Sequence, residues 1–273
     1  MAKMLQSFGN KSGPVIVCVP GLLGGAEDFR DIIARFQDKC HLLIFDPNAE
    51  RRQFGLNGLT VKVMQEIQFD YNANEIAKEL PEFTDKPVWM IGISLGGKII
   101  YDFAIKFPLL FKGAILTDVS PGSFGDSDLY IFVESLVNNL NMNQPWPELK
   151  KSLRSLISDD SLRSLIQSQI FYPDKKPPAA WKVGMANFKG LLRRQSMDEQ
   201  FEDYQKVDEI LAKNGSYTHI LKATELSAVN EESNEKLKKM KSIKIHPIEN
   251  SSHFLQISHK HILLDLIDQL ATK

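Results

Sequence analysis

The pentapeptide Gly92-Ile93-Ser94-Leu95-Gly96 constrains this chain more than any other feature of its sequence. It follows the continuous apolar run 88–93 and precedes a stretch whose apolar residues recur at spacings of three and four, which is typical of a helix. A strand must therefore turn sharply into a helix, with Ser94 at the bend. Glycine has no Cβ, so the flanking glycines relieve the crowding that such a turn creates.

Similar short apolar runs recur along the chain, and the one at 15–19 is rich in β-branched residues. Such runs are typical of strands buried on both faces of a parallel sheet. The other predicted strands cover 15–19, 41–45, 113–117, 219–223 and 243–248, and the predicted helices cover 28–36, 72–80, 97–107 and 261–270. Strands that alternate with helices predict an α/β fold with a mostly parallel central sheet flanked by helices.

The alternation is interrupted over residues 121–215. This interval instead shows amphipathic helical stretches separated by proline-rich turns, and the strand pattern resumes directly after it. We therefore expect residues 1–120 and 216–273 to form one α/β core, with 121–215 inserted into it as a helical cap.

The composition of the 273 residues, 43% hydrophobic and 25% charged, is typical of a globular protein. A net charge of −1 gives no general attraction to nucleic acid or anionic lipid. No segment approaches the roughly 18 apolar residues of a membrane span, and the start of the chain lacks a secretory signal pattern. The two cysteines lack metal-ligand spacing. We expect a cytoplasmic monomer or homodimer that uses no metal or other cofactor.

The strand before Ser94 and the helix after it are the context of a nucleophile elbow, which presents a serine hydroxyl at the top of a sheet. Leu95 would then offer its backbone N–H at the helix N-terminus, where free donors and the helix dipole stabilise an oxyanion. A second donor is expected from the glycine-rich loop 20–25, and Leu22 is our candidate. A phosphate-binding loop is the weaker interpretation there, because the Gly-Lys-Ser/Thr ending is absent.

A serine nucleophile needs a base, and histidine has the pKa suited to that role. His253 lies in the loop 249–254 beyond the carboxyl end of the last predicted strand, which is the edge where sites form in parallel sheets. The other histidines are predicted at strand starts, inside a strand or around the start of the closing helix. They are His41, His219, His246, His259 and His261.

A carboxylate must in turn orient the histidine. Asp118 follows the strand 113–117, which comes directly after the elbow, and Glu225 follows the strand 219–223. We favour Asp118 for its position and its shorter side chain, and Glu225 stays as the alternative.

With these residues in place, the chain resembles the α/β-hydrolase superfamily from Pro14 to Leu270. Within it, the chain is similar to small bacterial esterases and their mitochondrial relatives, which hydrolyse acyl esters and thioesters. The likeness rests on the segments 92–98, 116–121, 181–183 and 252–256. In that group the catalytic acid follows the sixth strand in an Asp-(Ile/Val)-(Ser/Ala)-Pro segment, which implies Asp118 here. The more usual acid position, after the seventh strand, holds a serine in that group, and Ser227 matches it.

Three loops depart from the pattern of this group. Pro20-Gly21 replaces the usual His-Gly of the oxyanion loop, although the backbone donor is retained. Ser252-His253 replaces Gly-His. The segment 46–52 replaces the usual Asp-x-Arg-Gly-x-Gly turn.

These features predict a serine esterase or thioesterase that acts on small to medium acyl substrates through an acyl-enzyme on Ser94. The apolar side chains expected around the acyl group are Leu23, Phe124, Trp181, Met185, Phe188 and Phe254. Two alternatives remain. A carbon–carbon bond hydrolase or a cofactorless lyase would use the same triad, whereas a non-catalytic ligand-binding protein on this scaffold would be expected to lack a triad member.

Overall fold

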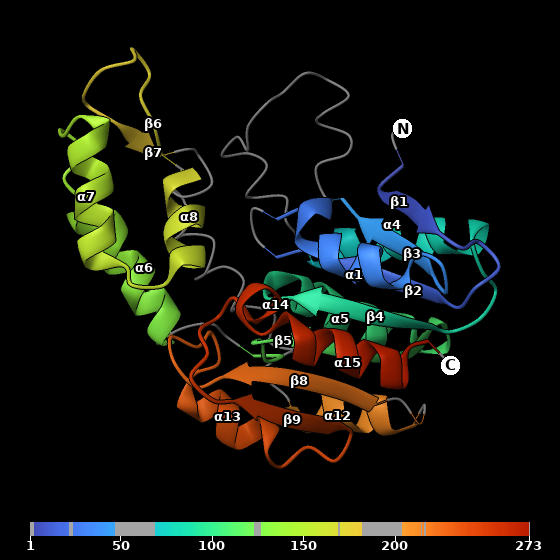
Figure 1. Cartoon of the computed structure of the whole chain (residues 1–273). Helices are drawn as coiled ribbons and strands as arrows, with labels where there is room; N and C mark the ends of the chain where they lie inside the picture. The colour runs from blue at the N-terminus through green and yellow to red at the C-terminus, as the bar shows by residue number, and fades with distance from the viewer. Residues whose placement is uncertain are drawn as a thin grey trace.

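A seven-stranded sheet forms the centre of the molecule in the computed structural model (Figure 1), which describes residues 3–21, 24–46, 69–122, 127–168, 170–181, 204–213, 215 and 217–272. The strand order is β1-β3-β2-β4-β5-β8-β9. These strands are β1 (Leu5–Gly9), β2 (Val15–Val19), β3 (His41–Phe45), β4 (Val88–Ile93), β5 (Phe111–Thr117), β8 (Tyr217–Ala223) and β9 (Ile243–Ile248). All neighbouring strands are parallel except β1 and β3, so the predicted α/β fold with a mostly parallel sheet is confirmed.

Helices cover both faces of this sheet. One face packs against α4 (Phe69–Glu79), α5 (Leu95–Lys106), α12 (Tyr204–Lys213) and α13 (Glu231–Leu237). The other packs against α1 (Arg30–Phe36), α14 (Leu255–Ser258) and α15 (Lys260–Leu270). Short 3-10 turns lie at η1 (Ala26–Phe29), η2 (Leu80–Glu82) and η3 (Pro108–Leu110).

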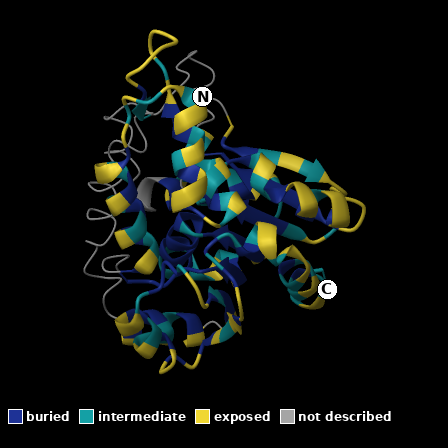
Figure 2. Ribbon diagram, turned by 60° about the vertical axis from the view of Figure 1, so that its left-hand side comes forward, coloured by how far each residue is buried: buried dark blue, intermediate teal, exposed yellow. Residues whose placement is uncertain are grey.

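Alternate residues of the inner strands enter different apolar clusters. In β2, Val17 packs with the cluster under α5, while Ile16 and Cys18 pack with the cluster under α1 and α15. Successive side chains of a strand point to opposite faces, which explains why a strand covered on both sides is apolar throughout. Figure 2 shows the strands as a buried layer between helices whose outer surfaces are exposed.

The antiparallel edge strand β1 was not predicted from the sequence pattern. Only Leu5 of its five residues is buried, and the others are partly or fully exposed. A strand at the edge of a sheet is paired on one side only, so backbone hydrogen bonding to β3 fixes it more than the burial of its side chains does.

Between β5 and β8 the chain forms a group of helices beside the sheet (Figure 1). They are α6 (Asp128–Asn139), α7 (Trp146–Leu156) and α8 (Asp160–Ser168), followed by a hairpin of β6 (Ile170–Phe171) and β7 (Ala180–Trp181). Side chains of α6, α7 and α8 share an apolar cluster of their own, here called the α6–α8 cluster. The hairpin is a feature that the helical patterns of this interval did not predict. Helix α12, later in the same interval, packs instead with the cluster under α5.

Two leucines of α7 test the packing of the α6–α8 cluster. Leu153 is fully buried, whereas Leu156 is 53% exposed. We expect Leu153→Ala to lower the free energy of unfolding by about 2–5 kcal/mol, because it leaves a cavity. The matched change Leu156→Ala should alter it by less than about 0.5 kcal/mol. Urea unfolding followed by circular dichroism measures both, and equal losses would contradict the packing of α7 described here.

Candidate active site

Ser94 stands between β4 and α5 in a conformation that few residues other than glycine adopt. Its φ is 50° and its ψ is −118°. Its N–H donates to the carbonyl of Thr117 at 3.1 Å, and its own carbonyl accepts from the N–H of Gly97 at 2.8 Å. These backbone hydrogen bonds hold the strained turn and fix the serine at the carboxyl edge of the sheet.

The glycines after Ser94 allow α5 to begin very close to neighbouring backbone and side chains. A Cβ on Gly96 would lie 2.1 Å from the carbonyl oxygen of Val19, and one on Gly97 would lie 2.3 Å from Cγ1 of Val119. Both distances are far shorter than a Cβ contact allows. The first turn of α5 therefore fits between the end of β2 and the loop after β5 only because these positions are glycine.

His253 connects Ser94 to Asp118. Its Nε2 lies 2.8 Å from Ser94 Oγ, and its Nδ1 lies 2.7 Å from Asp118 Oδ2. The serine follows β4, the aspartate follows β5 and the histidine follows β9, so three strand ends contribute one residue each. Asp118 and His253 are both buried. The structure thus brings together the three residues that were predicted as nucleophile, base and acid.

The Asp118 carboxylate has hydrogen bonds on both oxygens besides the contact with His253. Oδ1 accepts from the Ala223 N–H at 3.1 Å and from the Ser227 hydroxyl at 2.7 Å, and Oδ2 accepts from the Ala228 N–H at 2.8 Å. Burial by itself would raise the pKa of Asp118. The hydrogen bond and charge of His253, with the bonds from Ser227 and Ala228, outweigh it and hold the pKa below its ordinary value. Asp118 is therefore stabilised as a carboxylate.

The alternative acid, Glu225, differs from the buried Asp118 in its exposure. Its side chain is exposed, and its backbone N–H donates to the carbonyl of Ser251 at 2.9 Å. Ser227, at the position that resembles the usual acid site, instead contacts Asp118 through its hydroxyl. The sequence points to Ser227 only by that correspondence, and it does not show that the hydroxyl donates a hydrogen bond to Asp118.

Backbone strain is concentrated at the same edge of the sheet. Ser94, Asp118, Leu226 and Asn250 follow β4, β5, β8 and β9, and each has a φ between 45° and 53°. Residues other than glycine in this region cost about 1–3 kcal/mol each, and such residues cluster at active sites and ligand clamps. The loops that carry the three side chains are therefore held in defined, unfavourable conformations.

The remaining histidines are engaged elsewhere. His219 Nδ1 lies 2.9 Å from His246 Nε2 within the neighbouring strands β8 and β9, His41 Nε2 lies 2.7 Å from Ser7 Oγ, and His259 and His261 lie at the start of α15. Burial, followed by the charges of His246 and Lys244, lowers the pKa of His219 to about 4. His219 and His246 thus contact each other within the sheet, and neither is a candidate for the base that contacts Ser94.

The structure describes one of the two expected oxyanion donors, Leu95. Leu95 is the first residue of α5, and backbone N–H groups of a first helical turn have no acceptor within the helix. Leu22 and its neighbour Leu23 lie outside the described residues. Gly21, directly before them, is adjacent to the elbow, because a Cβ there would lie 3.4 Å from Ser94 Cβ. The loop that was predicted to supply the second donor thus begins beside the serine.

Of the side chains expected around an acyl group, Phe254 and Trp181 are described. Phe254 meets the ring of His253 edge-on, with centroids 5.4 Å apart, and it also packs against the α6–α8 cluster. Trp181 packs against that cluster too. Phe124, Met185 and Phe188 lie outside the described residues. Phe254 is therefore the described apolar candidate that touches a site residue.

Within the described ranges, no group of three or more His, Cys, Asp or Glu side chains is arranged to hold a metal ion. In the same part of the chain, no helix has the length and apolar character needed to cross a membrane.

Comparison with known proteins identifies the family of the chain. The model of the family described as alpha/beta hydrolase fold matches residues 14–155, just over half of the chain. The chain belongs to this family. The matched region contains β2 to β5, and with them Ser94 and Asp118.

Individual relatives have low sequence identity to this chain. The chain is 22% identical over 191 residues to ethanol acetyltransferase 1 of Wickerhamomyces anomalus, covering 65% of this chain and 46% of that protein. It is 24% identical over 169 residues to a serine hydrolase-like protein of Mus musculus, covering 60% and 51%. The aligned part thus spans about half the length of these relatives.

Two solved structures share the fold over almost the full length of the chain. One is a marine microorganism esterase, with a TM-score of 0.65, 16% identity and 97% of each chain covered. The other is a thioesterase domain from the curacin biosynthetic pathway, with a TM-score of 0.63, 15% identity, and 96% and 94% covered. At these identities the similarity establishes the α/β-hydrolase fold.

Removal of the Ser227 hydroxyl tests the environment of Asp118. We expect Ser227→Ala to lower the free energy of unfolding by about 1–3 kcal/mol at neutral pH, because a buried carboxylate loses a donor. A lowered pKa stabilises the fold above the ordinary value of 3.8, and this contribution is lost as the pH falls through the folded-state pKa. The deficit of the variant should therefore shrink as the pH falls below about 4.

Urea unfolding of both proteins from neutral pH to about pH 3 measures this difference. Ser233→Ala, at another buried serine, on α13, serves as the control and should show no such pH dependence. A Ser227→Ala deficit that is the same at every pH would contradict the role assigned to the hydroxyl.

Proposed function

We propose that this protein is a serine hydrolase that cleaves carboxylic ester or thioester bonds of small to medium acyl substrates. Ser94 is the nucleophile, His253 is the general base and acid, and Asp118 orients the histidine. The observation that carries the proposal is the unbroken set of contacts from Ser94 Oγ to His253 at 2.8 Å and from His253 to Asp118 at 2.7 Å. A non-catalytic scaffold has no need of this complete arrangement.

In the acylation step, Ser94 Oγ attacks the carbonyl carbon of the substrate while His253 Nε2 takes the hydroxyl proton. Asp118 accepts the hydrogen bond from Nδ1–H and stabilises the imidazolium that forms. The carbonyl oxygen becomes an oxyanion, for which the N–H groups of Leu95 and Leu22 are the proposed donors. The tetrahedral intermediate then expels the alcohol or thiol, which leaves with the proton from Nε2.

In the deacylation step, water takes the place of the leaving group. His253 Nε2 removes a proton from the water while the water oxygen attacks the acyl carbon. The bond between the acyl carbon and Ser94 Oγ then breaks, and the proton on Nε2 returns to the serine. The products are a carboxylic acid and the free enzyme, and every step uses groups of the chain itself.

The relative named as an ethanol acetyltransferase suggests a second acceptor for the same acyl-enzyme. If an alcohol attacks in place of water, His253 takes the alcohol proton and the product is a new ester. The acylation step is the same in both cases, so the acceptor alone separates hydrolysis from acyl transfer.

We also propose that α6, α7 and α8, within the interval 121–215, act as the cap of a core formed by 1–120 and 216–273, whereas α12 of that interval packs on the core. The separate apolar cluster shared by α6, α7 and α8 supports this division. The proposed acyl site lies between cap and core, and Phe254 supports it because it contacts both His253 and the α6–α8 cluster. The contributions of Leu23, Phe124, Trp181, Met185 and Phe188 remain predictions.

Labelling with a fluorophosphonate tests the nucleophile. We expect a single covalent adduct on Ser94 in the folded protein, detected by mass spectrometry of the digested chain, and none in Ser94→Ala.

Asp118→Asn should lower kcat by roughly 10³–10⁴-fold, because the histidine loses its orienting carboxylate. Glu225→Gln is the matched control and should keep wild-type activity. An unlabelled Ser94 would refute the proposal, and a large loss in Glu225→Gln would refute Asp118 as the acid.

The acyl preference is tested with p-nitrophenyl esters and acyl-CoA thioesters of graded chain length. We expect kcat/KM to rise over the shortest chains, because each buried CH₂ contributes about 0.8 kcal/mol, and to fall once the site is filled. The same assays with added ethanol, analysed for free acid and ethyl ester, identify the acceptor. Absence of turnover in both series would count against an esterase or thioesterase.

A further inference from the structure

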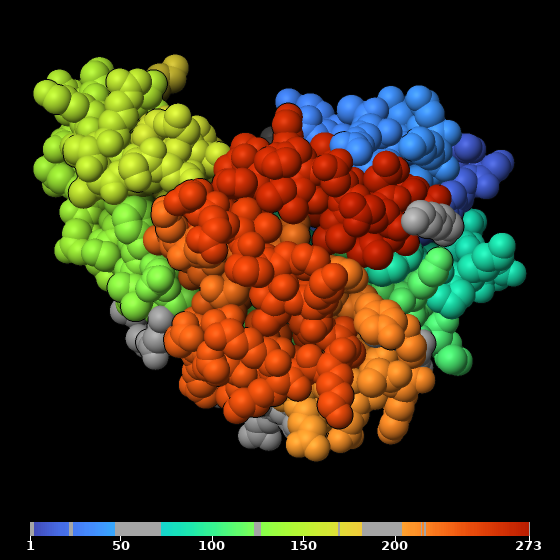
Figure 3. Space-filling model, turned by 60° about the horizontal axis from the view of Figure 1, so that its bottom comes forward, coloured from blue at the N-terminus to red at the C-terminus, as the bar shows by residue number. Residues whose placement is uncertain are grey.

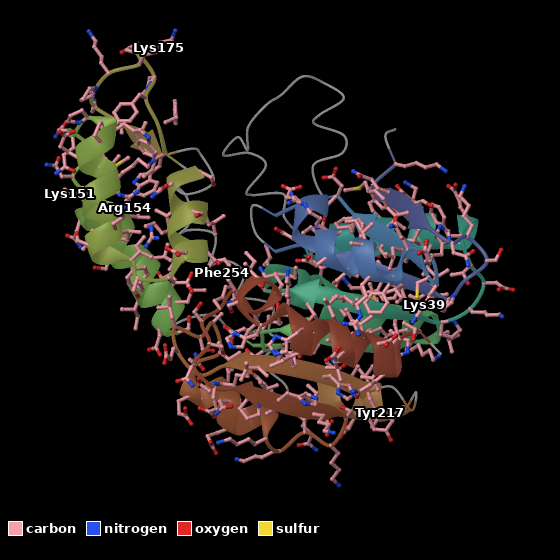
Figure 4. All side chains as sticks on the ribbon, viewed as in Figure 1. Lys39, Lys151, Arg154, Lys175, Tyr217 and Phe254 are labelled. Carbon is pink, nitrogen blue, oxygen red and sulfur yellow. The ribbon has the colours of Figure 1, made fainter. Side chains whose placement is uncertain are left out.

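The residues on either side of His253 both contact the helices inserted between β5 and β8. The Ser252 hydroxyl donates to Asp159 Oδ2, and the Phe254 ring packs against the α6–α8 cluster. Figure 4 labels Phe254 where the loop before α14 faces α8, and Figure 3 shows atoms of the inserted helices directly against the segment that follows β9. His253 therefore lies between two contacts with the insertion.

The other carboxylate oxygen of Asp159 caps the N-terminus of α8. Its Oδ1 accepts from the Leu162 N–H at 2.7 Å, which is the hydrogen bond of an N-cap residue. The turn before α8 has contacts that do not involve Asp159. The Arg163 guanidinium donates to the Ile157 carbonyl at 2.8 Å and pairs with Asp160. One carboxylate thus joins the first turn of α8 to the histidine loop.

The ends of the histidine loop are attached to the core rather than to the insertion. The Ser251 hydroxyl donates to the Ile248 carbonyl at 2.5 Å, and the Ser251 carbonyl accepts from the Glu225 N–H at 2.9 Å. At the other end, Leu255 is buried in the cluster under α1 and α15. Between these two anchors, Ser252 and Phe254 contact the insertion on either side of His253, and these contacts help to set its position.

We propose that Asp159 is a positioning residue for His253, acting through Ser252. The bond between them couples docking of the inserted helices to alignment of the imidazole with Ser94, and the inference rests on the proposed function. Hydrogen bonds to a carboxylate are stronger than neutral ones, and a displacement of about 1 Å in a reacting group can cost 10²-fold in rate.

The test compares variants that remove each end of this contact. Ser252→Ala deletes the donor, and Asp159→Ser deletes the second acceptor while keeping a residue that caps helices as well as aspartate does. The double variant measures whether the two changes are coupled, and Ser252→Thr restores a hydroxyl. Asp160→Ser is the matched control, because Asp160 is the next residue, is 84% exposed and pairs with Arg163.

We expect each single variant to lower kcat for p-nitrophenyl acetate by roughly 5- to 50-fold, with KM changed by less than about twofold, because alignment rather than binding is lost. The rate of fluorophosphonate labelling should fall in the same proportion. The double variant should be no slower than the slower single variant, since both changes break one contact. Ser252→Thr should recover most of the rate, and Asp160→Ser should match the wild type.

Several outcomes would overturn the inference. Wild-type kcat in both single variants would do so, as would a double variant whose loss is the product of the two single losses. A lower melting temperature with unchanged kcat per titrated active site would make Asp159 a structural cap only. If the wild type is not labelled at Ser94, the proposed function itself fails. If it is labelled and the variants react equally fast, only the coupling fails.

Discussion

The close approach of α5 to the sheet is the constraint on which the rest of the site depends. The first turn of this helix passes so near the carbonyl of Val19 and the side chain of Val119 that Gly96 and Gly97 admit no Cβ. This approach places Ser94 at the carboxyl edge of the sheet with a φ of 50°. The strain is sustained because hydrogen bonds to Thr117 and Gly97 fix the residue on both sides.

The site also requires a charged carboxylate, that of Asp118, inside the protein. Burying this carboxylate without hydrogen-bond donors would be strongly unfavourable, so protein donors must replace the water that it loses. The end of β8 supplies one through the Ala223 N–H, and the loop after β8 supplies two more through the Ala228 N–H and the Ser227 hydroxyl. These hydrogen bonds orient the carboxylate, and its remaining contact is with His253. The acid is thus built from two strands that lie side by side in the sheet.

The inserted helices complete the arrangement from outside the sheet. They have an apolar cluster of their own, yet they reach the core through Phe254 and through the bond between Asp159 and Ser252. Both contacts involve the immediate neighbours of His253. The part of the chain proposed to cover the substrate is therefore attached to the same loop that carries the proposed base.

The sequence by itself determined the parallel strands of the sheet, the elbow and the loop that holds His253, because these follow from local apolar periodicity and from the order of strands and helices. It left the choice between Asp118 and Glu225 to position and family likeness. It did not predict β1, the β6–β7 hairpin or the contacts of Ser227 and Asp159. Those depend on which loops become neighbours after folding. Ser227 and Asp118 are 109 residues apart, and they meet because β8 pairs with β5. Only the tertiary structure decides such pairings, since no local pattern records them.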